Sequence, residues 1–279
     1  MMSERLLELR GTDVWALTDC APAPLRWTEA FSDADPTARP ELRARWFADD
    51  LFHTRFGPFL LRHGGRTVLV DAGMGPGPVA YFPGLAGTLL DRLARVGVSA
   101  GEIDTVVFTH LHVDHVGWAC DEGSRPMFPG ARYVVAESEW HHWSANGESA
   151  GRAHHVEAIR RYVRPLVDSG HLTAVASDTE IVPGAWLRAA QGHSPGHHVL
   201  EVDCAGRKLL LAGDLWHCAA QIGEPSWCHR ADMDPAAAIA TRRRIAAWAV
   251  AEGAVIAAGH MPIDIAFGQI TRGDYCPLA

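Results

Sequence analysis

Four side chains of types that bind metal ions fall within six positions of the stretch THLHVDHVG: His110, His112, Asp114 and His115. The apolar run TVVF precedes the stretch and predicts a buried strand that ends just before the first histidine. Alternate side chains of an extended segment point to one face, so His110 and His112 can converge on one ion. Asp114 and His115 follow a reversal of the chain and are expected to face a second position nearby. The spacing predicts a metal site rather than a solvated loop that is only rich in histidine.

Further ligand candidates stand at three other predicted junctions between a strand and a loop. His193 in QGHSPGHHV, Asp214 in LLLAGDLW and His260 in VIAAGHMP each follow a glycine, which lets the backbone turn sharply. Asp214 lies directly beyond a buried apolar run, where an unpaired carboxylate is costly. One histidine after a glycine is more often an ordinary loop residue, but three such junctions in one chain favour a shared metal site.

The composition is typical of a folded chain, and the net charge argues against one class of partner. The 279 residues are 48% hydrophobic and include 16 histidines, more than packing requires, and histidine is the commonest ligand of borderline metals. The formal net charge of −8 argues against a nucleic-acid partner, which needs a basic face. The six cysteines form no CxxC pair, so buried or free thiols are expected rather than disulfides or a zinc-thiolate site. A small-molecule substrate is expected, and a homodimer is left open.

The sequence contains no recognisable secretion signal or membrane span. Charged residues at positions 4, 5, 8 and 10 interrupt the N-terminal stretch MMSERLLELRGTDVW, so no apolar signal core forms there. No run approaches the roughly 20 apolar residues that a membrane span needs. A cytoplasmic protein without a membrane partner is therefore the expectation.

Strand and helix patterns are mixed along the whole chain. Helices are expected within 87–98, 152–170 and 234–254, the last with Asp234 as its N-cap. Strands are expected in DVWAL, FGPFLLR, DTVVF, RYVVA, HHVLEV and AVIAA. This mixture predicts a layered α/β domain. Because no linker or low-complexity run divides the chain, residues 1–279 are expected to form a single domain.

Two segments resemble each other, and two others are typical of long loops. GRTVLVDAG (65–73) and GRKLLLAGD (206–214) both indicate a turn that enters a buried strand whose end opens into a loop. An internal duplication would explain the similarity, and so would chance between two short buried strands. The Gly/Pro-rich segment 73–87 and the segment 36–50 are expected as surface loops, which are often functional lids.

In this order, the motifs THLHVDHVG, GHSPGH, AGD and AGH resemble those of the metallo-β-lactamase superfamily of metal hydrolases. The resemblance implies an α/β fold of four layers, αββα, with two sheets face to face and helices outside. It also implies two Zn²⁺ ions per chain, with Mn or Fe as alternatives. Carried over by position, the resemblance implies that the first metal is bound by His110, His112 and His193. It implies that the second metal is bound by Asp114, His115 and His260, and that Asp214 bridges the two. Asp71 matches a family carboxylate that orients a ligand histidine.

The complete ligand set is similar to the branch with acyl-homoserine-lactone lactonases, pyridoxolactonase and methyl parathion hydrolase. This resemblance implies cleavage of a small ester, lactone or related acyl substrate by a metal-bridging hydroxide, with catalytic residues Asp114, Asp214 and His217. Asp114, or a water, would protonate the leaving group. Lactonases of the branch carry a tyrosine at the position of His217, so lactone specificity does not follow from the resemblance. A phosphotriesterase on the same metals is the alternative. The negative charge argues against a nuclease, and the full ligand set argues against a non-catalytic metal-binding protein.

Five side chains near these motifs are candidates for the substrate pocket: Phe82, Trp118, Trp140, His141 and Trp216. Trp118 follows the first motif closely, and Trp216 adjoins the expected bridging aspartate. Each of the aromatic residues is as readily a core residue, because tryptophan is largely buried in proteins.

Overall fold

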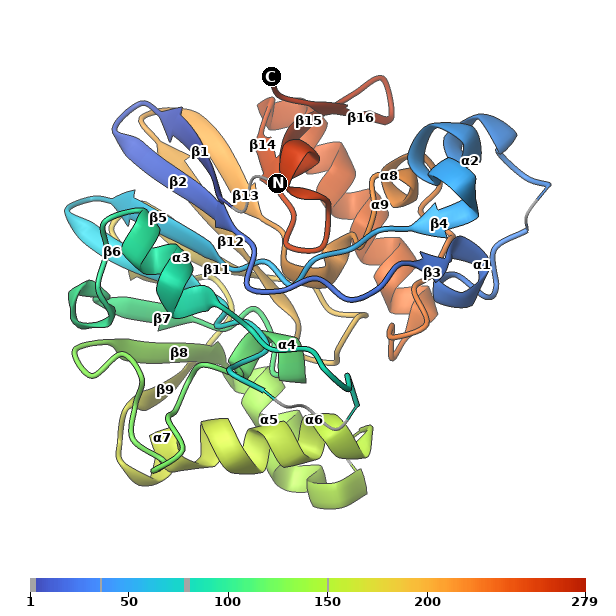
Figure 1. Ribbon diagram of the computed structural model, residues 1–279. Coiled ribbons are helices and arrows are strands. Elements are labelled where there is room, and N and C mark those ends of the chain that lie inside the picture. Colours follow the sequence, from blue (N-terminus) through green and yellow to red (C-terminus); the bar gives the residue numbers. More distant parts are fainter. Residues whose placement is uncertain (1–3, 36, 78–80, 150) are drawn as a thin grey trace.

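Two seven-stranded sheets lie face to face, with helices on both outer faces, in the computed structural model (Figure 1). The structure describes residues 4–35, 37–77, 81–149 and 151–279. The predicted four-layer αββα arrangement is confirmed. None of the helices in these residues is long and apolar enough to cross a membrane.

The first sheet is formed by the first part of the chain. Its order is β1 (Glu4–Leu9), β2 (Thr12–Leu17), β5 (Phe59–His63), β6 (Arg66–Val70), β7 (Thr105–Val107), β8 (Arg132–Ala136) and β9 (Leu172–Val175). The strands from β1 to β6 pair antiparallel, and those from β6 to β9 pair parallel. A separate two-stranded sheet joins β3 (Leu25–Arg26) and β4 (Leu51–Phe52).

The second sheet follows in sequence. Its order is β10 (Thr179–Val182), β11 (Ala185–Ala189), β12 (His198–Cys204), β13 (Arg207–Leu211), β14 (Val255–Ala257), β15 (Phe267–Thr271) and β16 (Asp274–Pro277). Only β13 and β14 pair parallel, and the other neighbours pair antiparallel. Each of the six segments expected as strands overlaps a strand of one of the two large sheets. The edge strand β1 was not predicted, because its half-exposed residues ERLLEL lack a clear alternation of apolar and polar side chains.

The central strands are buried on both faces, which explains their continuous apolar runs. In β5, Leu61 points into the core between the sheets, whereas its neighbour Leu60 points to the helices outside the first sheet. The core between the sheets combines Leu61 and Val70 of the first sheet with Leu200 and Leu211 of the second. Side chains alternate between faces along a strand, so a strand between two apolar layers needs apolar residues at every position.

Most of the helices lie on the outer faces of the two large sheets, whereas the first two lie beside the small sheet of β3 and β4 (Figure 1). The helices are α1 (Trp27–Ala30), α2 (Pro40–Trp46), α3 (Leu89–Arg95), α4 (Val113–Val116), α5 (Glu137–Asn146), α6 (Ala153–Ala158), α7 (Arg164–Asp168), α8 (Ala220–Gly223) and α9 (Pro235–Glu252). A π-helical turn, η4 (Ile159–Val163), joins α6 to α7. The predicted N-cap Asp234 accepts a hydrogen bond from the backbone N–H of Ala237 at 3.0 Å. The three predicted helical regions are confirmed.

The two similar segments occupy corresponding places in the two sheets. GRTVLVDAG forms β6 and GRKLLLAGD forms β13, and each of these strands is the second strand of a hairpin. Each also pairs parallel with the next strand of its sheet, β7 or β14. The loops that follow β6 and β13 therefore leave their sheets in equivalent ways, and both lead to the polar cluster described below.

The expectation of a loop over 36–50 is wrong, because Pro40–Trp46 forms α2. Leu42 of this helix is buried in an aromatic cluster with Trp27, Phe31 and Phe52, and that packing stabilises the short helix. Residue 36 and residues 78–80 of the other expected loop lie outside the described residues.

Candidate metal centre

The first group of polar side chains comes from the loop after β7. His110 and His112 precede α4, whereas Asp114 and His115 lie within it. The three imidazoles are buried, with at most 6% exposed. The loop is held in place by Thr109, whose backbone N–H donates to Oδ1 of Asp71 at 2.8 Å.

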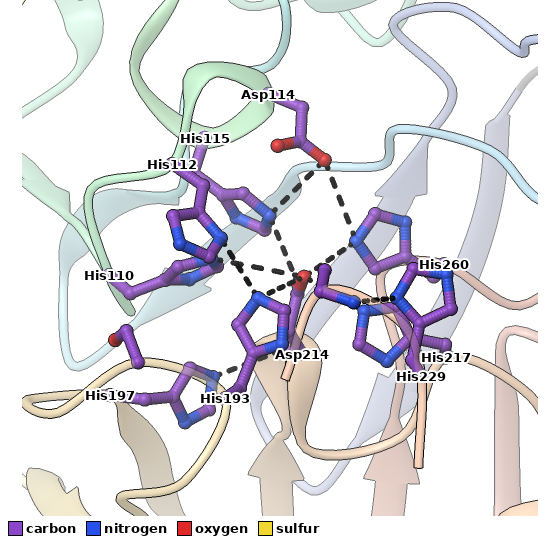
Figure 2. Close-up of polar contacts among 12 residues, drawn as sticks. His110, His112, Asp114, His115, His193, His197, Asp214, His217, His229 and His260 are labelled. Carbon is purple, nitrogen blue, oxygen red and sulfur yellow. Dashed lines mark hydrogen bonds and ion pairs between the residues drawn. The ribbon is translucent and has the colours of Figure 1, made fainter. Parts of the chain in front are cut away.

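The remaining predicted ligands come from loops of the second sheet. His193 lies between β11 and β12, Asp214 follows β13, and His260 follows β14. Gly213 precedes Asp214 with φ of 50°, and a Cβ atom there would lie 2.7 Å from Nε2 of His197. Only glycine allows both this conformation and this close approach. Figure 2 shows that the side chains from these loops point toward one another around Asp214.

Asp214 lies between two groups of donor atoms. One group contains His110, His112, His193 and Asp214, the other contains Asp114, His115, His260 and Asp214, and within each group the atoms lie within 4.8 Å of one another. Oδ2 of Asp214 is 3.1 Å from Nε2 of His193 and 2.9 Å from Nε2 of His260. The structure therefore brings together all seven residues that the sequence predicted as ligands.

These donors fit two divalent cations. Nε2 of His110, Nε2 of His115 and Oδ1 of Asp214 are buried and have no hydrogen-bond partner among the described residues. The last two atoms lie 3.1 Å from each other but form no hydrogen bond. Buried polar atoms in proteins nearly always have a hydrogen-bond partner, so three such atoms together without one require an explanation. Imidazole nitrogens and carboxylate oxygens are the ligands that zinc takes besides thiolates, and a cation between them would satisfy these atoms.

The electrostatics at two of the ligand histidines and at both carboxylates also favour metal binding. Burial lowers the pKa values of His110 and His112 well below the usual range, which keeps both rings neutral and able to bind a cation. Burial raises the pKa of Asp114, but the charges of His115 and His260 outweigh it and lower that pKa to about 2. Burial likewise opposes ionisation of Asp214, and the surrounding histidines lower its pKa well below the usual range.

Two carboxylates contact the second ring nitrogen of a ligand histidine. Oδ2 of Asp71 lies 2.8 Å from Nδ1 of His115, so this predicted carboxylate is in a position to orient a ligand histidine. Oδ1 of Asp232 lies 3.0 Å from Nδ1 of His193, and its other oxygen binds the buried guanidinium of Arg242. Burial lowers the pKa of His193, but Asp214 and Asp232 outweigh it and raise that pKa to about 9. Asp232 was not predicted; it and Arg242 lie in the segments DMDP and TRRR, between the motifs AGD and AGH.

Backbone positions of two ligands are also fixed by side chains that the sequence did not reveal. Nε2 of His197 accepts a hydrogen bond from the backbone N–H of Asp214 at 3.0 Å. Nδ1 of His260 lies 2.9 Å from the carbonyl oxygen of Arg55. The Arg55 guanidinium donates to the carbonyl oxygen of Met261 at 2.7 Å, so Arg55 holds both sides of the His260 loop.

Glu139 of α5 joins the two ligand loops. Its Oε1 accepts hydrogen bonds from the Leu111 N–H at 2.9 Å and the Trp143 indole N–H at 2.7 Å. Its Oε2 accepts from the Ser194 hydroxyl at 2.7 Å and the Gly196 N–H at 3.0 Å. One fully buried carboxylate therefore links the loop of His110 and His112 to the loop of His193, and no motif in the sequence indicated this role.

A cavity of about 720 Å³ opens above the cluster. The donor groups contribute His112, Asp114, His193, Asp214 and His260 to its lining. Apolar side chains form much of the rest, namely Leu25, Phe52, Phe56, Phe82 and Leu85. The shape and lining are those of a site for a small organic molecule.

His217 lies in this cavity beside the cluster. Its ring stacks between those of His229, with centroids 3.9 Å apart, and His260, with centroids 5.0 Å apart. Nε2 of His217 lies 3.3 Å from Oδ2 of Asp214. Burial lowers the pKa of His217 to about 4, so the ring is neutral at neutral pH and carries one N–H donor.

Of the five predicted pocket residues, Phe82 lines the cavity. The other four lie elsewhere. Trp118 is buried in the core and donates its indole N–H to Oδ1 of Asp19 at 3.0 Å. Trp216 is fully buried in the apolar layer under α9. Trp140 packs at the edge of the helical layer with the Arg164 guanidinium 5.4 Å from its ring, and His141 is exposed on α5.

A family model described as the metallo-beta-lactamase superfamily matches residues 58–260. The N-acyl homoserine lactonase AiiA of Bacillus thuringiensis subsp. kurstaki is 27% identical over 219 residues, which cover 72% of this chain and 79% of that protein. The ribonuclease Z of Mycobacterium avium (strain 104) is 44% identical over 187 residues, 59% of each chain.

Two solved structures share the whole fold. The hydrolase AbOPH of the beta lactamase superfamily superposes with a TM-score of 0.86 at 24% identity and covers 100% of this chain and 98% of its own. AidC, a dizinc quorum-quenching lactonase solved with a product, superposes with a TM-score of 0.81 at 19% identity, covering 99% and 98%. With this fold and with a family match over most of its length, the chain belongs to the metallo-β-lactamase superfamily.

Proposed function

We propose that this hydrolase of the metallo-β-lactamase superfamily binds two zinc ions and cleaves a small ester, lactone or related acyl substrate. The observation that carries the proposal is the position of Asp214, shared by two groups of buried donor atoms beneath the cavity. His110, His112 and His193 would hold one ion, Asp114, His115 and His260 the other, and Asp214 both.

Two zinc ions held there would lower the pKa of water and polarise a carbonyl oxygen. The protein contributes the surrounding geometry. Asp71, Asp232 and the carbonyl oxygen of Arg55 each lie beside the second ring nitrogen of a ligand histidine, which leaves the nitrogen that faces the cluster free to bind.

Asp114 would transfer a proton from the attacking water to the departing oxygen of the substrate. It lines the cavity and is half-buried, whereas Asp214 is buried. Its pKa of about 2 makes it a carboxylate at neutral pH, so it acts first as a base. It would take a proton from the attacking water and return it to the departing oxygen.

His217 would bind the carbonyl oxygen of the substrate. The backbone N–H of His217 donates to Oε1 of Gln221 at 2.7 Å, and the ring is stacked on both faces, so its position is fixed before substrate enters. A fixed neutral donor stabilises the negative charge that develops on the oxygen during attack.

The experiment has two parts. Metal analysis of protein prepared without chelator should find about two equivalents of zinc, manganese or iron per chain. Turnover is then compared on aryl esters, lactones, aryl phosphotriesters and a structured RNA. The phosphotriesters test the alternative for the same site, and the RNA tests the activity that the ribonuclease Z relative is named for. Less than one equivalent of metal, or highest efficiency on RNA, would refute the proposal.

A further inference from the structure

Two arginine side chains reach the cavity from different elements. Arg152 is the residue before α6, and Arg230 lies in the loop between α8 and α9. Both are exposed and both line the cavity. Nη2 of Arg152 donates a hydrogen bond to the carbonyl oxygen of Arg230 at 2.7 Å, so the two residues are neighbours.

The backbone around Arg230 is held on several sides. Its N–H donates to the carbonyl oxygen of Ala30 at 2.8 Å, while its carbonyl oxygen accepts from Arg152. The N–H of the preceding residue, His229, donates to Oδ2 of Asp232 at 3.0 Å. These contacts fix the backbone from which the Arg230 side chain extends, and that side chain lines the cavity.

Neither guanidinium forms an ion pair with a carboxylate of the described residues. The carboxylates in the described lining of the cavity are Asp114 and Asp214, and both belong to the donor groups. Outside those groups, this lining carries two positive charges and no negative one, in a chain whose net charge is −8. A cleft of one sign concentrates ligands of the opposite sign.

The lining of the cavity combines the two arginines with apolar side chains. Phe52, Phe56 and Phe82 can cover the hydrocarbon part of a substrate. A neutral substrate would leave the planar guanidinium donors in water, whereas a carboxylate accepts two parallel hydrogen bonds from one guanidinium.

We propose that the substrate carries a carboxylate away from the bond that is cleaved, joined to it by an apolar spacer, and that Arg152 and Arg230 bind this carboxylate. The inference rests on the proposed hydrolase function and adds the charge of the substrate to it.

The test compares two esters with acyl chains of equal length, 4-nitrophenyl hexanoate and the mono-4-nitrophenyl ester of adipic acid, on the metal-loaded enzyme. We expect kcat/KM to be about tenfold higher for the adipate ester, since a charge-assisted hydrogen bond contributes that much. Arg152→Gln and Arg230→Gln should each reduce this ratio, and the double variant should bring it close to unity. The hexanoate value is the internal reference, because a loss common to both esters cancels in the ratio. Arg243→Gln on α9 removes the same charge from an exposed position outside the described cavity lining and serves as the matched control.

A second measurement separates this inference from the proposed function. Calorimetry gives the dissociation constants of 6-oxoheptanoate and 2-heptanone, which differ in the terminal carboxylate and need no turnover. If neither ester is hydrolysed, the proposed function fails, but tighter binding of 6-oxoheptanoate that depends on both arginines still supports the inference. Equal binding of the two ketones to the wild-type protein would overturn it. So would a preference that survives in the double variant, because the carboxylate would then be bound elsewhere.

Discussion

Asp232 and His193 form a buried pair in which the carboxylate directs the imidazole: Oδ1 lies 3.0 Å from Nδ1, and Nε2 of the same ring lies 3.1 Å from Oδ2 of Asp214. Arg242 donates to the other oxygen of Asp232. The carboxylate thus accepts on both oxygens, which an amide cannot do.

Asp232→Asn should therefore weaken metal binding at the group that contains His193. Loss of a carboxylate behind a ligand histidine costs about 10- to 100-fold in metal affinity. Competition with a chromophoric chelator measures the metal affinity. Asp178→Asn, at an exposed position outside the donor groups, provides the control. Unchanged affinity would show that Asp232 has no role in holding His193.

Asp214→Ala should lose both metals and all turnover. Because the side chain belongs to both donor groups, its removal takes one ligand from each ion. Metal content by mass spectrometry and activity on the best substrate of the panel check this. Retained activity in this variant would be incompatible with a bridging role.

His217→Ala should keep the metal content and lower kcat by about 100-fold, with a smaller change in KM, because the ring is expected to bind an oxygen mainly in the transition state. His217→Tyr restores a hydrogen-bond donor and should recover part of the loss. If the alanine variant lost metal instead, His217 would be a ligand, as its place in a third group with His193 and Asp232 allows.

Removal of metal should lower the thermal stability of the protein. A cation that binds only the folded chain adds about 2.7 kcal/mol per site at a hundred times its dissociation constant. Thermal denaturation with chelator, and then with increasing zinc, should give a rising Tm. The Asp214→Ala variant should not respond, and a wild-type Tm independent of zinc would contradict the assignment.

Glu139→Gln should destabilise the fold by about 3 kcal/mol. Each carboxylate oxygen of Glu139 accepts two hydrogen bonds, and the amide nitrogen that replaces one of them cannot accept any. Urea denaturation measures the change. Glu137→Gln, at an exposed position of the same helix, should unfold at the wild-type urea concentration. Equal midpoints for the two variants would show that the Glu139 bonds contribute little.

The sequence predicted the donor groups because their residues follow buried apolar strands. His115, Asp214 and His260 each lie within a short stretch after such a strand, so strand prediction and motif recognition locate them together. The same reasoning identified the layered fold, because the central strands carry apolar residues on both faces.

The residues that support the cluster could not be predicted in this way. Trp118 was expected in the pocket, but its indole binds Asp19, a residue 99 positions away without any motif. Glu139 lies on a helix, and three of its four partners, Leu111, Ser194 and Gly196, come from loops that meet only in the folded protein. Such contacts depend on tertiary distances, which local patterns do not contain.

The order of the sheets along the chain has a consequence for fragments of this protein. All strands of the first sheet precede residue 176, and all strands of the second follow residue 178. His110, His112, Asp114 and His115 belong to the first part, and His193, Asp214 and His260 to the second. Each donor group therefore draws ligands from both parts. Two polypeptides divided between β9 and β10 would each hold an incomplete set, and recovery of bound metal on mixing them would report their reassembly.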